Sequence, residues 1–159
     1  YMLVTPLQLA EMSALIANKG KHVQPKLVKD NISSLAREEW GGDVEVGNVD
    51  NWELIINAME KVVSSPKGTA YWRIGKGMQY SMAAKTGTAQ VVSIAQGEDY
   101  DAEKLKEFER DHSLFIAFAP IEDPQIAIAV ILENSNGASS VARKVTDAYL
   151  LPKLQKTGE

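Results

Sequence analysis

Apolar residues recur at helical spacing near the start of the chain. Thr5 and Pro6 are typical of a helix N-terminus, and Gln8 stands where a capping box places an amide side chain. The apolar positions that follow are Leu9, Met12, Leu15 and Ile16. This pattern predicts a helix that ends near Gly20, a residue suited to the helix C-terminus.

A second helical pattern begins near Asn51 and stops at the helix-breaking residues 64–68. The apolar face of this expected helix consists of Trp52, Ile55, Ile56, Met59, Val62 and Val63. The preceding residues 21–50 contain a proline and several glycines, which predict an irregular connection.

Strand-like patterns occupy the middle of the chain. Residues 114–119 and 126–132 are apolar runs of strand length, and residues 120–124 between them hold two prolines and an aspartate. They predict an antiparallel hairpin, which we expect at the centre of the sheet because both faces of each strand are apolar. A further strand is expected over residues 83–93.

The last helical pattern covers residues 139–151, with Pro152 expected just past its end. Its apolar side consists of Val141, Val145, Ala148 and Tyr149. Two helices, three antiparallel strands and a covering helix together predict an α+β fold.

Composition narrows the function classes. The 159 residues suit a single domain, and none of them is cysteine, which removes disulfides, thiolate metal sites and cysteine nucleophiles. Only His22 and His112 could act as imidazole ligands, and we expect no metal and no cofactor. A structural role is favoured for His112, which begins a strand. A net charge of −4 with dispersed lysines argues against nucleic-acid binding.

The most charged stretch is residues 97–111. It holds seven acidic and three basic residues, so its net charge of −4 equals that of the whole chain. The pattern predicts a short solvated helix on a protruding insertion, in which only Leu105 and Phe108 could pack inward.

One short motif suggests chemistry. Lys85 supplies a fixed cation, and Thr86 and Thr88, two residues apart, share one face of the strand. Two hydroxyls beside an ammonium suit the binding of a carboxylate. Gly87 points the other way and lets a neighbouring element pack close. The tripeptide Lys-Thr-Gly alone is weak evidence, because a lysine at a strand edge near a turn explains it equally well.

The wider sequence resembles one family. The resembling stretches are residues 1–10, 68–70, 83–91, 110–112, 117–120 and 131–134. Their order and spacing are similar to those of class B penicillin-binding proteins, in particular the elongation-type group (penicillin-binding protein 2) of Gram-negative bacteria. The Lys-Thr-Gly motif is the third signature of penicillin-binding proteins and serine β-lactamases.

The resemblance implies a serine-type D-Ala-D-Ala transpeptidase that cross-links peptidoglycan stem peptides during cell elongation through an acyl-serine intermediate, and that β-lactam antibiotics inactivate. By that resemblance Lys85 assists proton transfer and carboxylate binding, while Thr86, Gly87 and Thr88 form the substrate-binding strand. The backbone N–H of Thr88 would supply half of the oxyanion hole. The implied location is the periplasmic face of the inner membrane, with the membrane-bound elongation machinery as partner.

The other signatures of the family are missing. No serine begins an S-x-N motif, and the one S-x-x-K match, Ser64-Ser65-Pro66-Lys67, lies at the end of a helix and contains a proline. We therefore expect residues 1–159 to be the C-terminal portion of a transpeptidase domain, with the nucleophile and the membrane anchor in an N-terminal remainder. The alternative is a non-catalytic interaction module of the cell-wall synthesis machinery.

Overall fold

The computed structural model describes residues 3–26, 42–92, 101, 103 and 105–156. Three α-helices, α1 (Pro6–Ala17), α2 (Asp50–Ser64) and α3 (Ala138–Lys156), flank three strands, β1 (Ala83–Ala89), β2 (His112–Ala119) and β3 (Ile126–Leu132). Two short helical turns, η1 (Tyr71–Gly75) and η2 (Glu107–Glu109), lie between them in sequence. The predicted α+β class is confirmed.

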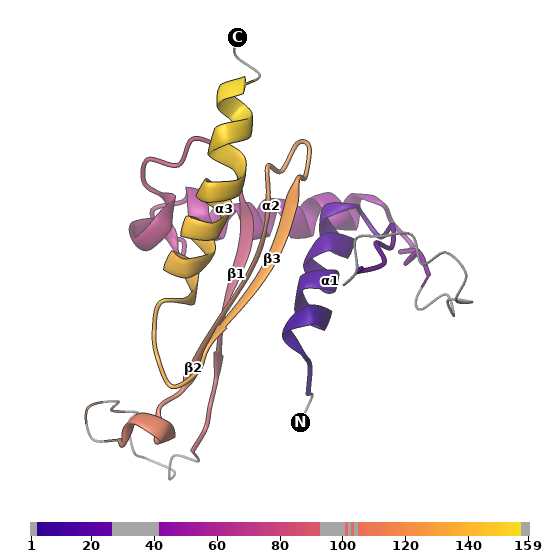
Figure 1. The fold of residues 1–159 in the computed structure, drawn as a ribbon. Coiled ribbons are helices and arrows are strands. Elements are labelled where there is room, and N and C mark those ends of the chain that lie inside the picture. The colour runs from indigo at the N-terminus through magenta and orange to yellow at the C-terminus, as the bar shows by residue number, and fades with distance from the viewer. Residues whose placement is uncertain (1–2, 27–41, 93–100, 102, 104, 157–159) are drawn as a thin grey trace.

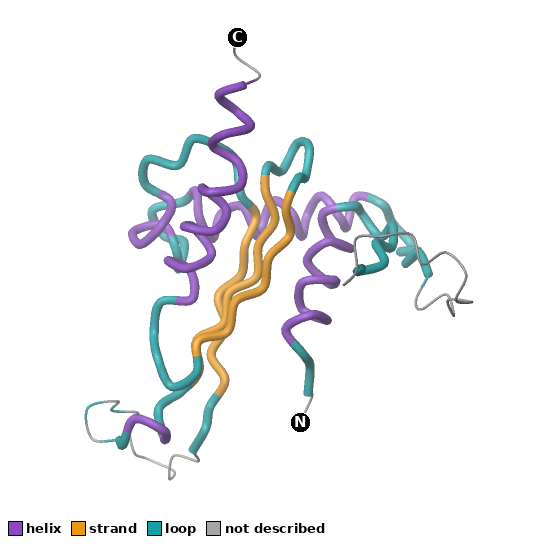
Figure 2. The backbone as a smooth tube through the Cα atoms, in the orientation of Figure 1, coloured by secondary structure: helices purple, strands orange, loops and turns teal. Residues whose placement is uncertain are grey.

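The strands form one antiparallel sheet in the order β1-β2-β3 (Figure 2). The predicted hairpin is confirmed, since β2 and β3 pair from Ser113↔Leu132 to Ala119↔Ile126. The expectation that both hairpin strands lie at the sheet centre is wrong for β3, which forms one edge of the described sheet. Helices cover both faces of β3. Its apolar residues therefore reflect the burial of both faces, and they do not show that the strand has a paired neighbour on each side.

Helices lie on both faces of the sheet, α3 on one side and α1 on the other, and α2 runs behind the strands and packs against β1 (Figure 1). Side chains alternate across β2, so Phe115 and Ala117 pack towards α3, whereas Phe118 packs with Ile56 and Met59 of α2. Both layers of the core therefore depend on the same central strand.

The first helix begins as predicted. The Thr5 hydroxyl accepts a hydrogen bond from the backbone N–H of Gln8. The side-chain oxygen of Gln8 accepts one from the backbone N–H of Thr5, which completes the capping box. The helix ends earlier than predicted, with Asn18 as its C-cap. Gly20 follows with φ 91°, a conformation that favours glycine. A Cβ there would lie 2.4 Å from the Val44 carbonyl oxygen, so only glycine lets the two backbone segments come this close.

The last helix differs from its prediction in two ways. It continues through Pro152 to Lys156, because one proline near the end removes only a single hydrogen bond, to the carbonyl of the exposed Ala148. The side chains that face the sheet are also different from those predicted. The buried residues of α3 are Ala138, Ser139, Ala142, Thr146 and Leu150. Small residues let the helix approach the bulky Phe115, which leaves Val141, Val145 and Tyr149 exposed.

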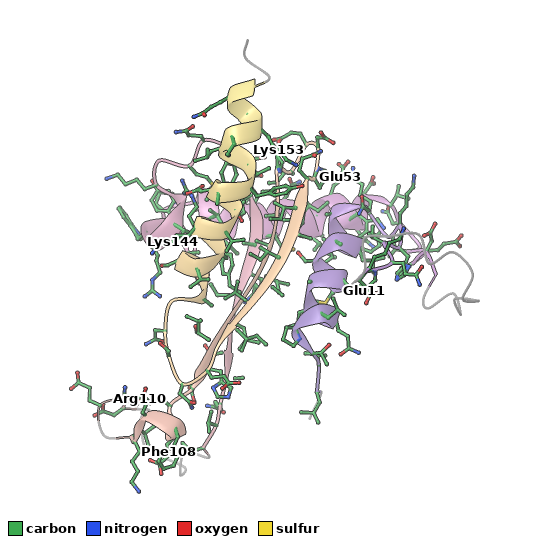
Figure 3. The ribbon with its side chains drawn as sticks, viewed as in Figure 1. Glu11, Glu53, Phe108, Arg110, Lys144 and Lys153 are labelled. Atoms are coloured by element: carbon green, nitrogen blue, oxygen red, sulfur yellow. The ribbon has the colours of Figure 1, made fainter. Side chains whose placement is uncertain are left out.

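The charged stretch is only partly described. Within its described residues, Glu107–Glu109 form one 3₁₀ turn at the end of the sheet where β2 begins (Figure 3). The expected inward packing of Phe108 is wrong, because its side chain is 66% exposed and the Lys106 ammonium lies over its ring. Its backbone carbonyl is held instead by the side-chain amide of Asn134.

Candidate active site

The Lys-Thr-Gly motif lies where β1 leaves the core. Ala83 and Ala84 at the start of the strand are fully buried, whereas Lys85, Gly87 and Thr88 are exposed. β1 is an edge strand of the described sheet, so its other side is open there. The predicted strand over residues 83–93 ends at Ala89, and Ser93 lies outside the described residues. The motif therefore stands on a rigid strand with one accessible edge.

The register fixes the direction of each side chain. The seven residues of β1 pair with β2 without a bulge, so Thr86 and Thr88, opposite Phe115 and Ser113, share one face. This confirms the prediction that the two threonines share one face of the strand. Lys85 leaves the strand on the other face, but its ammonium donates a hydrogen bond to the Thr86 carbonyl oxygen at 2.7 Å. The cation and the first hydroxyl residue therefore meet at the strand edge.

Gly87 provides the expected close approach. A Cβ at this position would lie 3.1 Å from the Cβ of Leu114, the residue opposite it on β2. That separation is tighter than ordinary van der Waals contact, so a side chain here would force Leu114 to move. The glycine thus keeps β1 flush against the central strand beside the two threonines.

Thr69 joins the motif from outside the strand. Its hydroxyl lies 3.1 Å from the hydroxyl of Thr86, and either group can donate. Thr69 lies in the connection after α2, between Gly68 and the buried Ala70. Sequence reasoning assigned no role to Thr69, although residues 68–70 belong to the stretches that carry the family resemblance. The contact joins residues 17 positions apart, so strand periodicity could not reveal it.

The tetrapeptide Ser64-Ser65-Pro66-Lys67 lies at the end of α2, as expected. The Ser65 hydroxyl accepts a hydrogen bond from the Lys67 amide at 3.3 Å, a local turn contact. The serine that an S-x-x-K motif would use is Ser64, the exposed last residue of α2, so it stands at the end of a helix and not at the start of one. The tetrapeptide therefore behaves as a helix end.

His112 has a structural setting. Its Nδ1 accepts a hydrogen bond from the backbone N–H of Asn134 at 2.9 Å, and Asn134 has φ 51°. The side-chain amide of Asn134 also donates to the carbonyl oxygens of Phe108 and Arg110. The imidazole therefore holds the turn after β3 against the start of β2. Among the described residues, no cluster of three or more His, Asp or Glu side chains could hold a metal ion.

A polar network anchors the segment before β1 to α3. The Tyr80 hydroxyl donates to Asp147 Oδ1 at 2.6 Å, and Arg143 Nε donates to both oxygens of the same carboxylate at 2.7 Å. Burial, followed by the hydrogen bond to Asp147, raises the pKa of Tyr80 well above its ordinary value. The network fixes where the chain enters β1, and hence where the motif stands.

Residues 2–150 match the family that is described as "Penicillin binding protein transpeptidase domain". The chain belongs to this family. Its relatives include the peptidoglycan D,D-transpeptidase MrdA of Acinetobacter baumannii, 40% identical over 94% of this chain and 23% of the relative. The chain thus spans about a quarter of the length of this curated relative.

Solved structures of the family share the fold. Pseudomonas aeruginosa PBP2, in complex with WCK 5153, superposes with a TM-score of 0.74 at 38% identity over 95% of this chain and 31% of that one. Helicobacter pylori PBP2 in its complex with MreC gives a TM-score of 0.68 at 27% identity, covering 89% of this chain and 23% of that one. The resemblance stated from the sequence is confirmed.

Proposed function

We propose that the chain is the Lys-Thr-Gly-bearing, C-terminal portion of a peptidoglycan D,D-transpeptidase domain. The full enzyme would cross-link stem peptides through an acyl-serine intermediate during cell elongation. Family membership and the name of the Acinetobacter relative support this activity. The observation that carries it is the open edge of β1, where the Lys85 ammonium contacts the Thr86 carbonyl and the side chains of Thr86 and Thr88 share one face of the strand.

The carboxylate of a D-Ala-D-Ala end would bind beside this edge. The ammonium of Lys85 supplies a positive charge, and the hydroxyls of Thr86 and Thr88 supply two donors on one face. In the reaction, Lys85 would also move a proton to and from a serine on the other part of the enzyme. Gly87 keeps the strand in place between the two threonines.

The hydrogen bond of Lys85 supports a role for the Thr88 backbone. In an antiparallel pair, the N–H and C=O of one residue point to the same side of the strand, and the direction alternates from residue to residue. The Thr86 carbonyl accepts from a side chain at the edge of the sheet. Thr88, two residues further on, then directs its N–H to the same open edge. A donor there suits an oxyanion hole for the tetrahedral intermediate.

The nucleophile is assigned to a different part of the enzyme. The chain contains no S-x-N motif, and its one S-x-x-K match ends a helix. The partner within the enzyme would be the N-terminal remainder with the reactive serine. We use the term complete transpeptidase for this chain joined to that serine-bearing part. Its ligands would be stem peptides and β-lactam antibiotics, as the family description suggests.

A relative also supports a proposal for the cellular setting. The Helicobacter relative forms a complex with MreC, which favours a membrane-bound elongation machinery as partner of the complete transpeptidase. The proposed location is the periplasmic face of the inner membrane, with the anchor in the serine-bearing part. Within the described residues, no helix is both long enough and apolar enough to cross a membrane.

Lys85→Ala in the complete transpeptidase tests the proposal. We expect the rate of acylation by a penicillin to fall at least about a hundredfold, because a residue that assists proton transfer is removed. Lys67→Ala is the matched control, since this exposed lysine lies outside the motif, and it should acylate at the wild-type rate. Unchanged acylation by Lys85→Ala, with loss of assembly, would favour the interaction module instead.

A further inference from the structure

The hydroxyls of Thr69 and Thr86 form a pair at the proposed carboxylate site. Their oxygens are 3.1 Å apart, which is within hydrogen-bonding distance. Thr69 comes from the connection between α2 and η1, so it reaches the strand from a separate element. A second element therefore contacts a hydroxyl that the proposed function assigns to ligand binding.

The backbone on both sides of Thr69 is firmly held. The Gly68 amide donates to the Ser65 carbonyl at 2.7 Å, and the Ala70 amide donates to the Val62 carbonyl at 3.0 Å. A Cβ at Gly68 would lie 2.3 Å from the Lys61 carbonyl oxygen, so only glycine permits this approach to the end of α2. Ala70 is 1% exposed. These contacts fix Thr69 relative to the helix and the core.

We propose that Thr69 is a positioning residue that orients the Thr86 hydroxyl towards the carboxylate of the ligand; this inference rests on the proposed function. A hydroxyl has a single proton to donate and can also accept. When Thr86 gives its proton to a carboxylate, its oxygen is free to accept the proton of Thr69. The hydrogen bonds then run from Thr69 to Thr86 to the ligand, and each strengthens the next.

The exposure of the pair separates this role from a structural one. Thr69 is exposed and Thr86 is half-buried, so water can replace either hydroxyl in the folded chain. Loss of the Thr69 hydroxyl should therefore leave the thermal stability of the complete transpeptidase unchanged. Its effect should appear only when Thr86 must donate to a ligand.

The test compares Thr69→Val, Thr69→Ser and Ser65→Ala in the complete transpeptidase, with a penicillin as probe. We expect Thr69→Val to lower the second-order acylation rate about fivefold, the effect of one hydrogen bond. Thr69→Ser keeps the hydroxyl and should restore the wild-type rate. Ser65→Ala removes another hydroxyl from the same connection and should be acylated at the wild-type rate. All three variants should have the melting temperature of the wild type.

Two further measurements show whether Thr69 acts through Thr86 and the carboxylate. Thr69→Val should have no additional effect in a Thr86→Val background, because the two side chains act as one unit. It should also have no effect on acylation by the methyl ester of the same penicillin, which has no free carboxylate. An undiminished rate in Thr69→Val, additive losses, or an equal loss with the ester would each overturn the inference. A wild-type enzyme that is not acylated at all would overturn the proposed function, and the inference with it.

Discussion

The ammonium of Lys85 donates a hydrogen bond to the carbonyl oxygen of Thr86, the next residue of the same strand, at 2.7 Å. This contact draws the cation to the edge of β1, although the lysine side chain begins on the face opposite the two threonine hydroxyls. A short strand thus presents positive charge at its edge and two hydroxyl-bearing side chains on one face.

Gly87→Ala tests how closely β1 must pack against β2. The added methyl would lie 3.1 Å from the Cβ of Leu114. Because Leu114 is half-buried and can shift, we expect a loss of about 1 kcal/mol in the free energy of unfolding of the complete transpeptidase, the lower end of overpacking costs. Denaturant titration measures this loss.

Gly47→Ala is the matched control for this change. A Cβ at Gly47 would meet no heavy atom within 4 Å, so the free energy of unfolding should stay at the wild-type value. If Gly87→Ala were as stable as Gly47→Ala, the close approach to Leu114 would have no energetic role.

Tyr80→Phe tests the network that fixes the entry to β1. The variant removes the hydrogen bond to Asp147 but leaves Asp147 paired with Arg143. We expect the free energy of unfolding of the complete transpeptidase to fall by about 1 kcal/mol. Tyr149→Phe, an exposed tyrosine on α3, should show no loss and serves as the control.

The pH dependence of that difference follows from the raised pKa of Tyr80. The folded chain holds the phenolic proton more tightly than the unfolded chain, in which the ordinary value is 10.0. The stabilisation is therefore complete below pH 10 and is lost as the pH rises through the folded value. Denaturant titrations at increasing pH should show that the difference in the free energy of unfolding between wild type and Tyr80→Phe shrinks only above pH 10. A difference that shrinks at lower pH would contradict the assigned hydrogen bond.

The outer edge of β3 predicts the behaviour of the chain on its own. Within the described sheet this strand pairs only with β2, and an unpaired edge invites pairing with other chains. Val145 and Tyr149 of α3 are also 46% and 42% exposed. We expect the isolated chain to self-associate and the serine-bearing part to suppress this. Sedimentation of both samples measures it, and a monomeric isolated chain that melts cooperatively would contradict the prediction.

Local signals in the sequence predicted much of the fold. The capping box at Thr5 and the turn chemistry between residues 119 and 126 depend on neighbours in the chain, and the structure confirms the first helix and the hairpin. The pairing of the two threonines followed from strand periodicity alone. Features of this kind require no knowledge of distant residues.

Other features depended on contacts that the sequence does not display. The prediction of the buried face of α3 was wrong. Close packing against Phe115 selects the small residues Ala138 and Ala142, and Tyr149, which was predicted to be buried, is exposed. The contact of Thr69 with Thr86 was missed for a similar reason, since it depends on the path of the chain after α2. Side-chain size and chain path decide both cases, and neither has a periodic signature.

Intact mass spectrometry can show which chain carries the nucleophile and whether acylation requires Lys85. The 159-residue chain would be assembled with a separate serine-bearing chain and incubated with a penicillin. We expect one penicillin adduct on the serine-bearing chain and none on this chain, with adduct formation lost in Lys85→Ala. An adduct on this chain itself would overturn the proposed function, as would two folded, assembled chains that carry none.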